Sequence, residues 1–319
     1  MTASHWTPAI AVLALVAACG GRDARAPAAT ADTAATGTPA ADTTAGAGAP
    51  SKVEGFQNPE SARYDAELDV WYVSNVNGSP VAKDGNGYIS RLHGDGTVDS
   101  MKWIVGGARG ATLNAPKGLG LQGDTLWVAD VDVVRAFNRR TGAPVASVDL
   151  KGKAKFLNDL VVGPDGVYIT DTGVESSGGG MKHTGPDQVF NIGAGHKATV
   201  ALASDSLMGP NGIAWDGGHG RYVIVPFAGT VVRGWTPGSR TVTSLGTTAG
   251  QLDGVEVLDS SRLLITSWAD SSLFVLQDGK STTVAGDLPS PADIGIDTKR
   301  HRVAIPLLME NRVEFRSLP

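Results

Sequence analysis

The sequence predicts an all-β fold, a six-bladed β-propeller, from its strand pattern and from an internal repeat. After the first fifty residues, short runs of β-branched and aromatic residues are separated by Gly, Pro, Asn and Asp, and no stretch has apolar residues at helical spacing. Six segments share one layout, in which a polar residue begins a strand and a turn leads into a second, apolar strand. The segments are PESARYDAELDVWYVSN, PKGLGLQGDTLWVAD, NDLVVGPDGVYITD, PNGIAWDGGHGRYVIVPF, LDGVEVLDSSRLLITSW and ADIGIDTKRHRVAIPLL.

The first polar positions of the six segments set the period of the repeat. They are Glu60, Lys117, Asn158, Asn211, Asp253 and Asp293, and they are 57, 41, 53, 42 and 40 residues apart. A period of about 40 to 50 residues with several short strands per unit is typical of a β-propeller. The regular spacing argues against the alternative, a β-sandwich with a second domain. We therefore expect the propeller to occupy residues 51–319, with one blade starting near each of these positions.

Each blade also needs a third and a fourth strand. The second repeat supplies them as VVRAFN and VASVDL, and the fifth as SLFVLQ and STTVAG. The sixth repeat stops after NRVEFRSL and therefore has only three strands. We expect the segment near Lys52 to Phe56 to supply the missing outer strand, since this closes the ring and removes an exposed sheet edge.

An export signal is expected at the amino terminus. Residues 9–18, AIAVLALVAA, form an apolar run of ten, which is too short to span a bilayer as a helix but suits the core of a signal peptide. Cys19 follows small residues and precedes two glycines, and this arrangement resembles the lipobox of bacterial lipoproteins, in which the cysteine becomes the lipid-bearing first residue. The n-region MTASHWTP departs from that pattern because it has no Lys or Arg. An ordinary cleaved signal is the alternative.

Residues 20–50 are predicted to be a flexible tether between the signal, residues 1–19, and the propeller. Of these 31 residues, 26 are Ala, Thr, Gly or Pro, and none has an apolar side chain larger than alanine. The segment therefore cannot bury enough surface to offset the entropy of ordering. Its root-mean-square reach is about 30 Å. We expect an exported lipoprotein of the bacterial envelope, periplasmic or anchored to the outer membrane through Cys19, or a secreted soluble protein if the signal is ordinary.

The charge balance and the cysteine count exclude two further features. With 27 Lys plus Arg against 32 Asp plus Glu and no basic run, nucleic acid is not an expected partner. Cys19 is the single cysteine, so no intramolecular disulfide supports the fold. The oligomeric state stays open.

Propeller geometry brings the first polar positions together, because the inner strand of every blade starts at the central channel on one face. Four of them, Glu60, Asn158, Asn211 and Asp253, offer only oxygen donors, two carboxylates and two amide carbonyls. Such hard ligands favour a divalent cation in the central channel, calcium first, with magnesium or manganese as alternatives. Asn-Gly and Asp-Gly pairs are also common turns, but four oxygen donors at equivalent repeat positions are hard to explain as turns.

These motifs resemble those of the senescence-marker-protein/gluconolactonase/strictosidine-synthase-like group of six-bladed propellers, which is related more distantly to paraoxonase and diisopropylfluorophosphatase. The resemblance covers about residues 55–319, and its most specific pieces are PES, LNDLVVGPDG, GPNGIAW and LDGVEV. It implies a divalent cation in the channel, held by Glu60, Asn158, Asn211 and Asp253. It also implies hydrolysis of lactones or related esters.

The implied chemistry is metal-assisted hydrolysis, in which the cation polarises the carbonyl and stabilises the oxyanion while water attacks. Asp253 is the candidate for positioning or deprotonating that water, and a role as ligand only is the alternative. His183 lies in the long connection TGVESSGGGMKHTGP of the third blade. It can serve as a proton carrier, since its ordinary pKa lies near neutrality. A solvated loop histidine is the alternative.

Three further residues are expected at the substrate pocket. Phe156 stands where sugar-lactone hydrolases of the group often carry an arginine, two residues before Asn158, which favours an apolar lactone or ester over a polyhydroxylated one. Lys117 can approach a substrate carboxylate or oxyanion, or form a salt bridge with Asp130. Asp293 can neutralise such a cation or make an outer contact to the metal.

A non-enzymatic function is the alternative to hydrolysis. Propellers also serve as binding platforms, and a tethered domain with a metal-closed channel can capture a small ligand or a partner protein. The four oxygen donors Glu60, Asn158, Asn211 and Asp253 favour catalysis. The absence of an arginine at the position of Phe156 weakens the case for catalysis.

Overall fold

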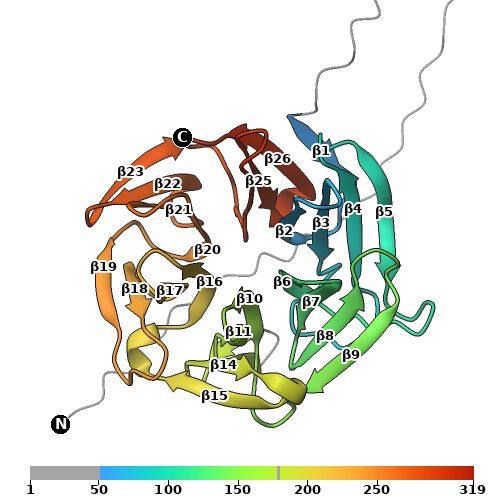
Figure 1. The fold of residues 1–319 in the computed structure, drawn as a ribbon, viewed down its shortest axis with the longest axis horizontal. Helices are drawn as coiled ribbons and strands as arrows, with labels where there is room; N and C mark the ends of the chain where they lie inside the picture. The colour runs from blue at the N-terminus through green and yellow to red at the C-terminus, as the bar shows by residue number, and fades with distance from the viewer. Residues whose placement is uncertain (1–50, 178–179) are drawn as a thin grey trace, which may run out of the picture. The chain divides into compact units, whose positions relative to one another are not determined.

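The computed structural model describes residues 51–177 and 180–319, and in this part of the chain six four-stranded antiparallel sheets surround a central channel (Figure 1). This confirms the all-β, six-bladed propeller. The first three blades, from the channel outward, are β2 (Pro59–Asp65), β3 (Val70–Asn75), β4 (Tyr88–His93) and β5 (Val98–Val105); β6 (Pro116–Gln122), β7 (Thr125–Asp130), β8 (Val133–Asn138) and β9 (Pro144–Asp149); and β10 (Leu157–Gly163), β11 (Gly166–Asp171), β14 (Gln188–Ile192) and β15 (Ala198–Ala203).

The last three blades follow the same order. They are β16 (Pro210–Asp216), β17 (Arg221–Pro226), β18 (Val231–Trp235) and β19 (Thr243–Thr247); β20 (Leu252–Val257), β21 (Arg262–Ser267), β22 (Ser272–Gln277) and β23 (Lys280–Ala285); and β24 (Gly295–Asp297), β25 (Arg302–Leu307), β26 (Arg312–Ser317) and β1 (Lys52–Glu54). Three single-turn 3-10 helices lie in connections: η1 (Ala194–His196), η2 (Asp205–Leu207) and η3 (Leu308–Glu310).

The sixth blade joins the two ends of the described chain. Strand β1 pairs antiparallel with β26, and Val53 lies opposite Val313. The predicted closing strand therefore supplies the outer edge of a blade whose other three strands are the last in the sequence. Phe56, which follows β1, is fully buried and packs with Trp71 and Phe315 between the sixth and the first blade. The expected signal peptide, Cys19 and the tether lie outside the described residues.

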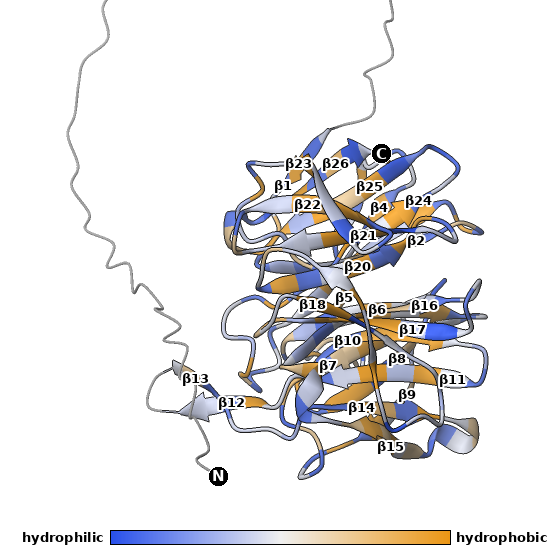
Figure 2. Ribbon diagram, turned by 90° about the vertical axis from the view of Figure 1, so that its left-hand side faces the viewer, coloured by the Kyte–Doolittle hydropathy of each residue, from blue (hydrophilic) through white to orange (hydrophobic). Residues whose placement is uncertain are grey.

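One hairpin stands apart from the blades. Strands β12 (Val174–Ser177) and β13 (Gly180–His183) pair with each other within the connection from β11 to β14, and Figure 2 shows them projecting from the body of the propeller. Because β11 ends at Asp171, opposite Leu157, this connection leaves the blade at the end where β10 begins. The hairpin therefore lies on the face where the inner strands start. No helix in the described residues is long and apolar enough to cross a membrane.

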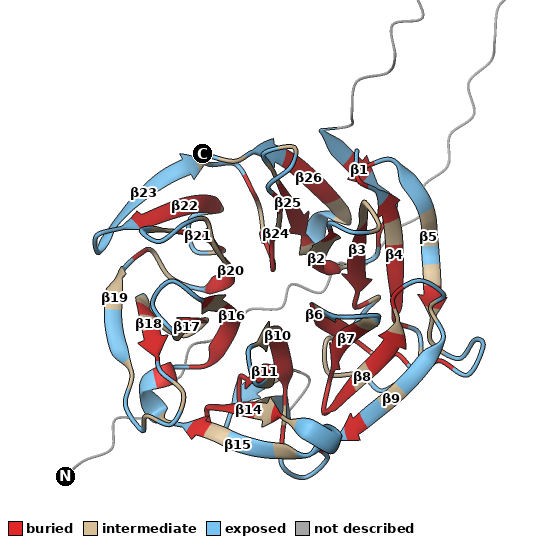
Figure 3. Ribbon diagram, viewed as in Figure 1, coloured by how far each residue is buried: buried red, intermediate tan, exposed pale blue. Residues whose placement is uncertain are grey.

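The hydrophobic core lies between neighbouring blades. Figure 3 shows buried inner strands and largely exposed outer strands. One cluster joins the second and third blades through Trp127, Leu160 and Phe190, and another joins the third and fourth through Tyr168, Tyr222 and Trp235. Each sheet is thus held chiefly by side chains of the next one, as in other repeat architectures.

The inner strands share an irregularity that positions the channel side chains. In five blades the pairing of the first two strands skips two residues, for example between Pro210 and Ile213 and between Leu252 and Val255. The skipped pairs are Glu60–Ser61, Lys117–Gly118, Asn158–Asp159, Asn211–Gly212 and Asp253–Gly254. A Cβ atom at Gly212 would come within 2.3 Å of the Asp253 carbonyl oxygen, so glycine allows neighbouring blades to approach closely here.

Candidate metal and hydrolase site

The six first polar positions all lie at the start of an inner strand and are all buried. Five are in β2, β6, β10, β16 and β20, and Asp293 lies two residues before the first residue of the sixth inner strand, β24. We call this set the channel ring; its members are Glu60, Lys117, Asn158, Asn211, Asp253 and Asp293. Hydrogen bonds link neighbouring blades at the ring: the Asp293 amide donates to the Glu60 carbonyl at 2.8 Å, and the Asn211 side chain donates to the carbonyl of Leu252, the residue before Asp253, at 3.3 Å.

Several oxygens of the channel ring lack a hydrogen-bond partner. Within the described residues, Glu60 Oε2, Asp253 Oδ1 and Asp293 Oδ1 are buried and accept no hydrogen bond. Leaving such a group unsatisfied costs about 1–3 kcal/mol, and more if it is charged. The two amides instead use their nitrogens, since Asn158 Nδ2 donates to Thr172 Oγ1 at 3.0 Å and Asn211 Nδ2 donates to a carbonyl. Unpaired carboxylate oxygens beside amides that donate elsewhere fit a cation.

The donor types limit the kind of metal site. In the part of the chain that the structure describes, no three His, Cys, Asp or Glu side chains form a metal-binding cluster. A cation at the ring would therefore need amide oxygens beside the carboxylates of Glu60 and Asp253. Mixed carboxylate and amide oxygens are ligands of calcium or magnesium rather than of zinc.

Burial and mutual repulsion raise the pKa values of the ring carboxyls. The pKa of Glu60 lies well above its ordinary value because the group is buried and faces Asp253 and Asp293. The same causes, burial first and then Asp293, raise the pKa of Asp253 to about 8. Burial raises the pKa of Asp293 to about 6, against the opposing charge of Arg63. Negative charge in the ring is therefore incompletely compensated by the protein itself.

This arrangement predicts how the stability of the metal-free protein depends on pH. The pKa of Asp253 is about 8 in the folded protein and about 3.9 in an unfolded chain. The raised pKa means that its contribution to stability is full below about pH 4 and is lost as the pH rises towards 8. With divalent cations chelated, we expect Asp253→Asn to become more stable than the wild type by about 1–3 kcal/mol at pH 8 and to differ little at pH 4.

Denaturant unfolding at several pH values in the presence of a chelator measures this difference. Asp205→Asn is the matched control, because Asp205 is an exposed aspartate outside the ring. A constant difference between Asp253→Asn and the wild type across this pH range would contradict the prediction.

The predicted salt bridge between Lys117 and Asp130 is wrong. Asp130 accepts from the backbone amides of Asn114 and Ala115, each at 2.9 Å, and pairs with Arg135 at 3.1 Å. Arg135 reaches it from the adjacent strand of the same blade, so the carboxylate is already satisfied. The Lys117 ammonium, whose pKa is lowered by burial, instead donates to the Ala115 carbonyl at 3.2 Å and is influenced by the nearby charge of Glu60.

Phe156 lies beside Lys117 in the ring wall. The Lys117 ammonium lies 4.3 Å from the centre of the Phe156 ring, a cation–π contact between the second and third blades. The Phe156 amide donates to Asp171 Oδ1 at 2.8 Å, which anchors the backbone just before β10. This wall therefore combines an apolar ring with one cation.

His183 lies at the base of the hairpin rather than among the ring residues. Its Nε2 is 2.5 Å from Asp187 Oδ1, and its side chain is half exposed. Asp187 is buried and also accepts from the Gly209 amide at 2.8 Å. These contacts fix the end of the hairpin on the ring face, and they leave the predicted role of His183 as proton carrier a proposal.

Two charged groups, the buried Asp159 and the partly buried Arg63, were not predicted from the sequence as functional candidates. Asp159 accepts from the Ile213 amide at 2.8 Å and so joins the third blade to the fourth. Arg63 donates from Nε to the Leu119 carbonyl at 3.0 Å, pairs with Glu256, and lies 3.7 Å from Asp293. It thus crosses the channel below the ring. The only sequence signal for Asp159 is its position one residue after Asn158, and the only one for Arg63 is its position three residues after Glu60.

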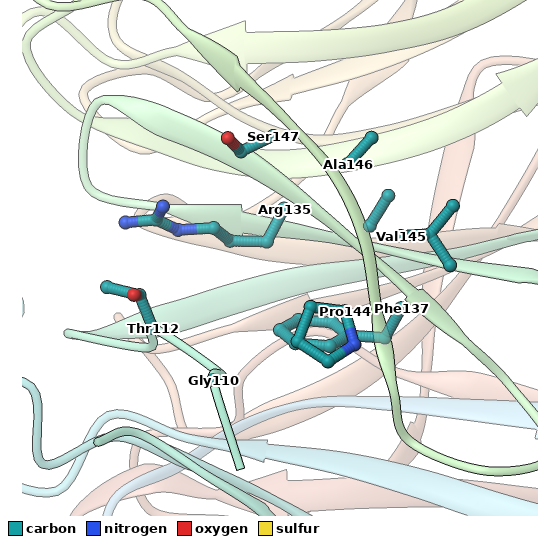
Figure 4. A pocket seen from close by; sticks show the side chains of 9 residues that line it. Gly110, Thr112, Arg135, Phe137, Pro144, Val145, Ala146 and Ser147 are labelled. Atoms are coloured by element: carbon teal, nitrogen blue, oxygen red, sulfur yellow. The ribbon is translucent and has the colours of Figure 1, made fainter. Parts of the chain in front are cut away.

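A surface hollow elsewhere contains no ring residue. It has a volume of about 240 Å³ and lies on the second blade, between the loop before β6 and strands β8 and β9 (Figure 4). Its one charged lining side chain is Arg135, which is paired with Asp130. The hollow therefore does not extend the candidate site.

The chain is thus a six-bladed β-propeller with a buried ring of polar side chains at one end of its channel. No protein-family model matches it, and no curated protein sequence matches it. A solved structure described as a "putative gluconolactonase" aligns over 84% of this chain and 92% of its own, with a TM-score of 0.61 and 16% identity. A chain of a nidogen–laminin complex aligns over 71% and 78%, with a TM-score of 0.56 and 15% identity. At these identities the likeness shows the fold alone.

Proposed function

We propose that the protein is a divalent-metal-dependent hydrolase of lactones or related esters. The observation that supports this most directly is the pair of buried carboxylates, Glu60 and Asp253, each with an oxygen that lacks a partner among the described residues. Asn158 and Asn211 add amide oxygens, and this donor set suits calcium best, with magnesium or manganese as alternatives. The fold that the chain shares with the structure described as a "putative gluconolactonase" agrees with this proposal.

The ring residues have different roles in the proposed reaction. A bound divalent cation supplies Lewis-acid polarisation of the substrate carbonyl and stabilises the developing oxyanion. Glu60, Asn158, Asn211 and Asp253 would hold it. Asp253 also positions or deprotonates the attacking water, a role that needs its ionised carboxylate.

Two other side chains complete the proposed mechanism. The Lys117 ammonium, which lies beside Glu60, contacts the substrate oxygen or a substrate carboxylate, and Asp293 offsets its charge. His183 carries protons at the hairpin, where its contact with Asp187 orients the imidazole.

The side chain of Phe156 predicts the substrate class. Because the Phe156 side chain offers no hydrogen bond to a substrate hydroxyl, we expect kcat/KM for an alkyl-substituted lactone to exceed that for gluconolactone by about tenfold or more. Initial rates for both lactones with calcium present measure the ratio. Phe156→Arg is the matched variant and should shift the preference towards gluconolactone. A clear preference of the wild type for the sugar lactone would refute the apolar substrate.

The second candidate function is a non-catalytic platform that binds a small ligand or a partner protein. The observation that favours it is the shared fold with a chain of the nidogen–laminin complex. Metal binding without turnover of any lactone or ester would support this function over hydrolysis. In either case we propose export to the bacterial envelope with a lipid on Cys19.

A further inference from the structure

The central channel contains a cavity at the end away from the channel ring. Its volume is about 280 Å³, and no ring residue lines it. The lining residues follow the ring positions on the same inner strands, with Arg63 on β2, Val162 on β10, Trp215 on β16 and Glu256 on β20. They lie three or four residues further along each strand, which at about 3.3 Å per residue places the cavity about 10 Å from the ring.

The wall of this cavity is largely aliphatic. Val161, Val162, Ile213, Val255 and Val257 line it, from three blades. Val161, Val162 and Val257 are only partly buried, so apolar surface inside the channel remains accessible to solvent. A cavity of this size and composition favours a short aliphatic group, since covering apolar surface contributes about 25 cal/mol per Å².

The polar end of the cavity has an excess of negative charge. Arg63 donates from Nε to the Leu119 carbonyl and pairs through one terminal nitrogen with Glu256, and its other terminal nitrogen lies 3.7 Å from Asp293, beyond hydrogen-bond distance. Two carboxylates thus oppose one guanidinium. Glu256 uses only Oε1 towards Arg63; its Oε2 accepts no hydrogen bond from the described residues, and the side chain is 14% exposed. Glu256 Oε2 is therefore an open acceptor at this cavity.

We propose that this cavity binds a small alkylammonium ion, whose primary ammonium head donates to Glu256 and whose short aliphatic chain packs against the valine wall. An ammonium supplies the donors that the open carboxylate oxygen lacks, and it offsets the excess negative charge. A carboxylate ligand would meet that same negative charge. The proposal does not depend on the hydrolase function, because the cavity and the ring share no side chain.

Calorimetric titration of the full-length chain, saturated with calcium, with hexylammonium tests the proposal. Hexan-1-ol and hexanoate are the matched probes, since they keep the chain and change only the head. We expect a dissociation constant of about 1 mM or lower for hexylammonium and binding at least about tenfold weaker for hexanoate. Saturable binding of hexanoate as tight as that of hexylammonium, or no saturable binding of hexylammonium, would overturn the proposal.

Two variants separate this cavity from other acidic surfaces. Glu256→Gln keeps an oxygen for Arg63 but removes the charge, and we expect it to weaken hexylammonium binding about tenfold or more while leaving calcium binding unchanged. Val162→Phe fills the cavity without changing any charge and should have the same effect on hexylammonium. Glu175→Gln, at an exposed glutamate of the hairpin, is the control. Unchanged hexylammonium binding in both cavity variants, with melting temperatures near that of the wild type, would overturn the assignment to this cavity.

Discussion

Asp253→Asn and Asn158→Ala are each expected to weaken calcium binding by about 100-fold or more and to abolish metal-dependent lactone hydrolysis. Asp253 contributes a buried carboxylate whose Oδ1 has no partner in the described residues. In Asp253→Asn the charge is lost while the shape is kept. In Asn158→Ala an amide oxygen of the third blade is lost from the set. Both losses reduce the number of hard oxygen ligands, on which calcium affinity depends.

Calorimetric calcium titration and hydrolysis rates, measured on the same samples, check this expectation. Asp205→Asn, at an exposed position away from the ring, is the control for a general effect of removing a carboxylate. Circular dichroism shows whether each variant keeps its fold. If folded Asp253→Asn and Asn158→Ala bind calcium as tightly as the wild type, the ring is not the metal site.

Loss of calcium binding with unchanged hydrolysis would give a different answer. The ring would then hold a structural ion, and the reacting groups would lie elsewhere. His183→Ala helps to distinguish these cases, because His183 contacts Asp187 and no ring residue. A fall in kcat with unchanged calcium affinity would support its role as proton carrier.

The sequence could predict the positions of the ring because they repeat. A residue that begins the inner strand of one blade has counterparts at the same point of the others, so Glu60 and Asp253 could be placed near each other although they are 193 residues apart. The closing strand was predictable for a related reason: the last repeat has three strands, and a propeller blade needs four. Both inferences depend on symmetry and not on the detail of side-chain packing.

Contacts between side chains of different blades could not be predicted in this way. Ser61 Oγ donates to Asp293 Oδ2 at 2.5 Å across 232 positions, and no local pattern marks the pair. The error about Lys117 has the same origin. Lys117 and Asp130 belong to neighbouring strands of one blade, so the sequence suggests that they pair. Arg135 and two backbone amides instead contact the Asp130 carboxylate, and the position of Arg135 depends on how β8 packs. Which group a buried carboxylate such as Asp130 pairs with therefore depends on the tertiary structure.

Removal of residues 1–56 is expected to prevent stable folding, whereas removal of residues 1–50 is expected to leave the propeller intact. The longer deletion removes β1 and Phe56 and exposes the edge of β26, which β1 covers in register from Lys52 to Glu54. An open, unpaired edge promotes association between chains. Loss of the buried Phe56 side chain alone costs about 3–5 kcal/mol, which is a large part of the 5–15 kcal/mol that typically stabilises a domain.

Soluble yield, size-exclusion chromatography and thermal unfolding of the two shortened chains measure this difference. Phe56→Ala in the chain that starts at Ser51 separates the side chain from the strand, since it keeps the backbone pairing of β1 with β26. We expect it to remain folded but less stable by about 3–5 kcal/mol. If the chain lacking residues 1–56 stayed monomeric and melted within a few degrees of the chain lacking residues 1–50, closure by β1 would not stabilise the ring. The sixth blade would then be stable with three strands, and the amino-terminal segment would serve only to attach the propeller to whatever precedes it.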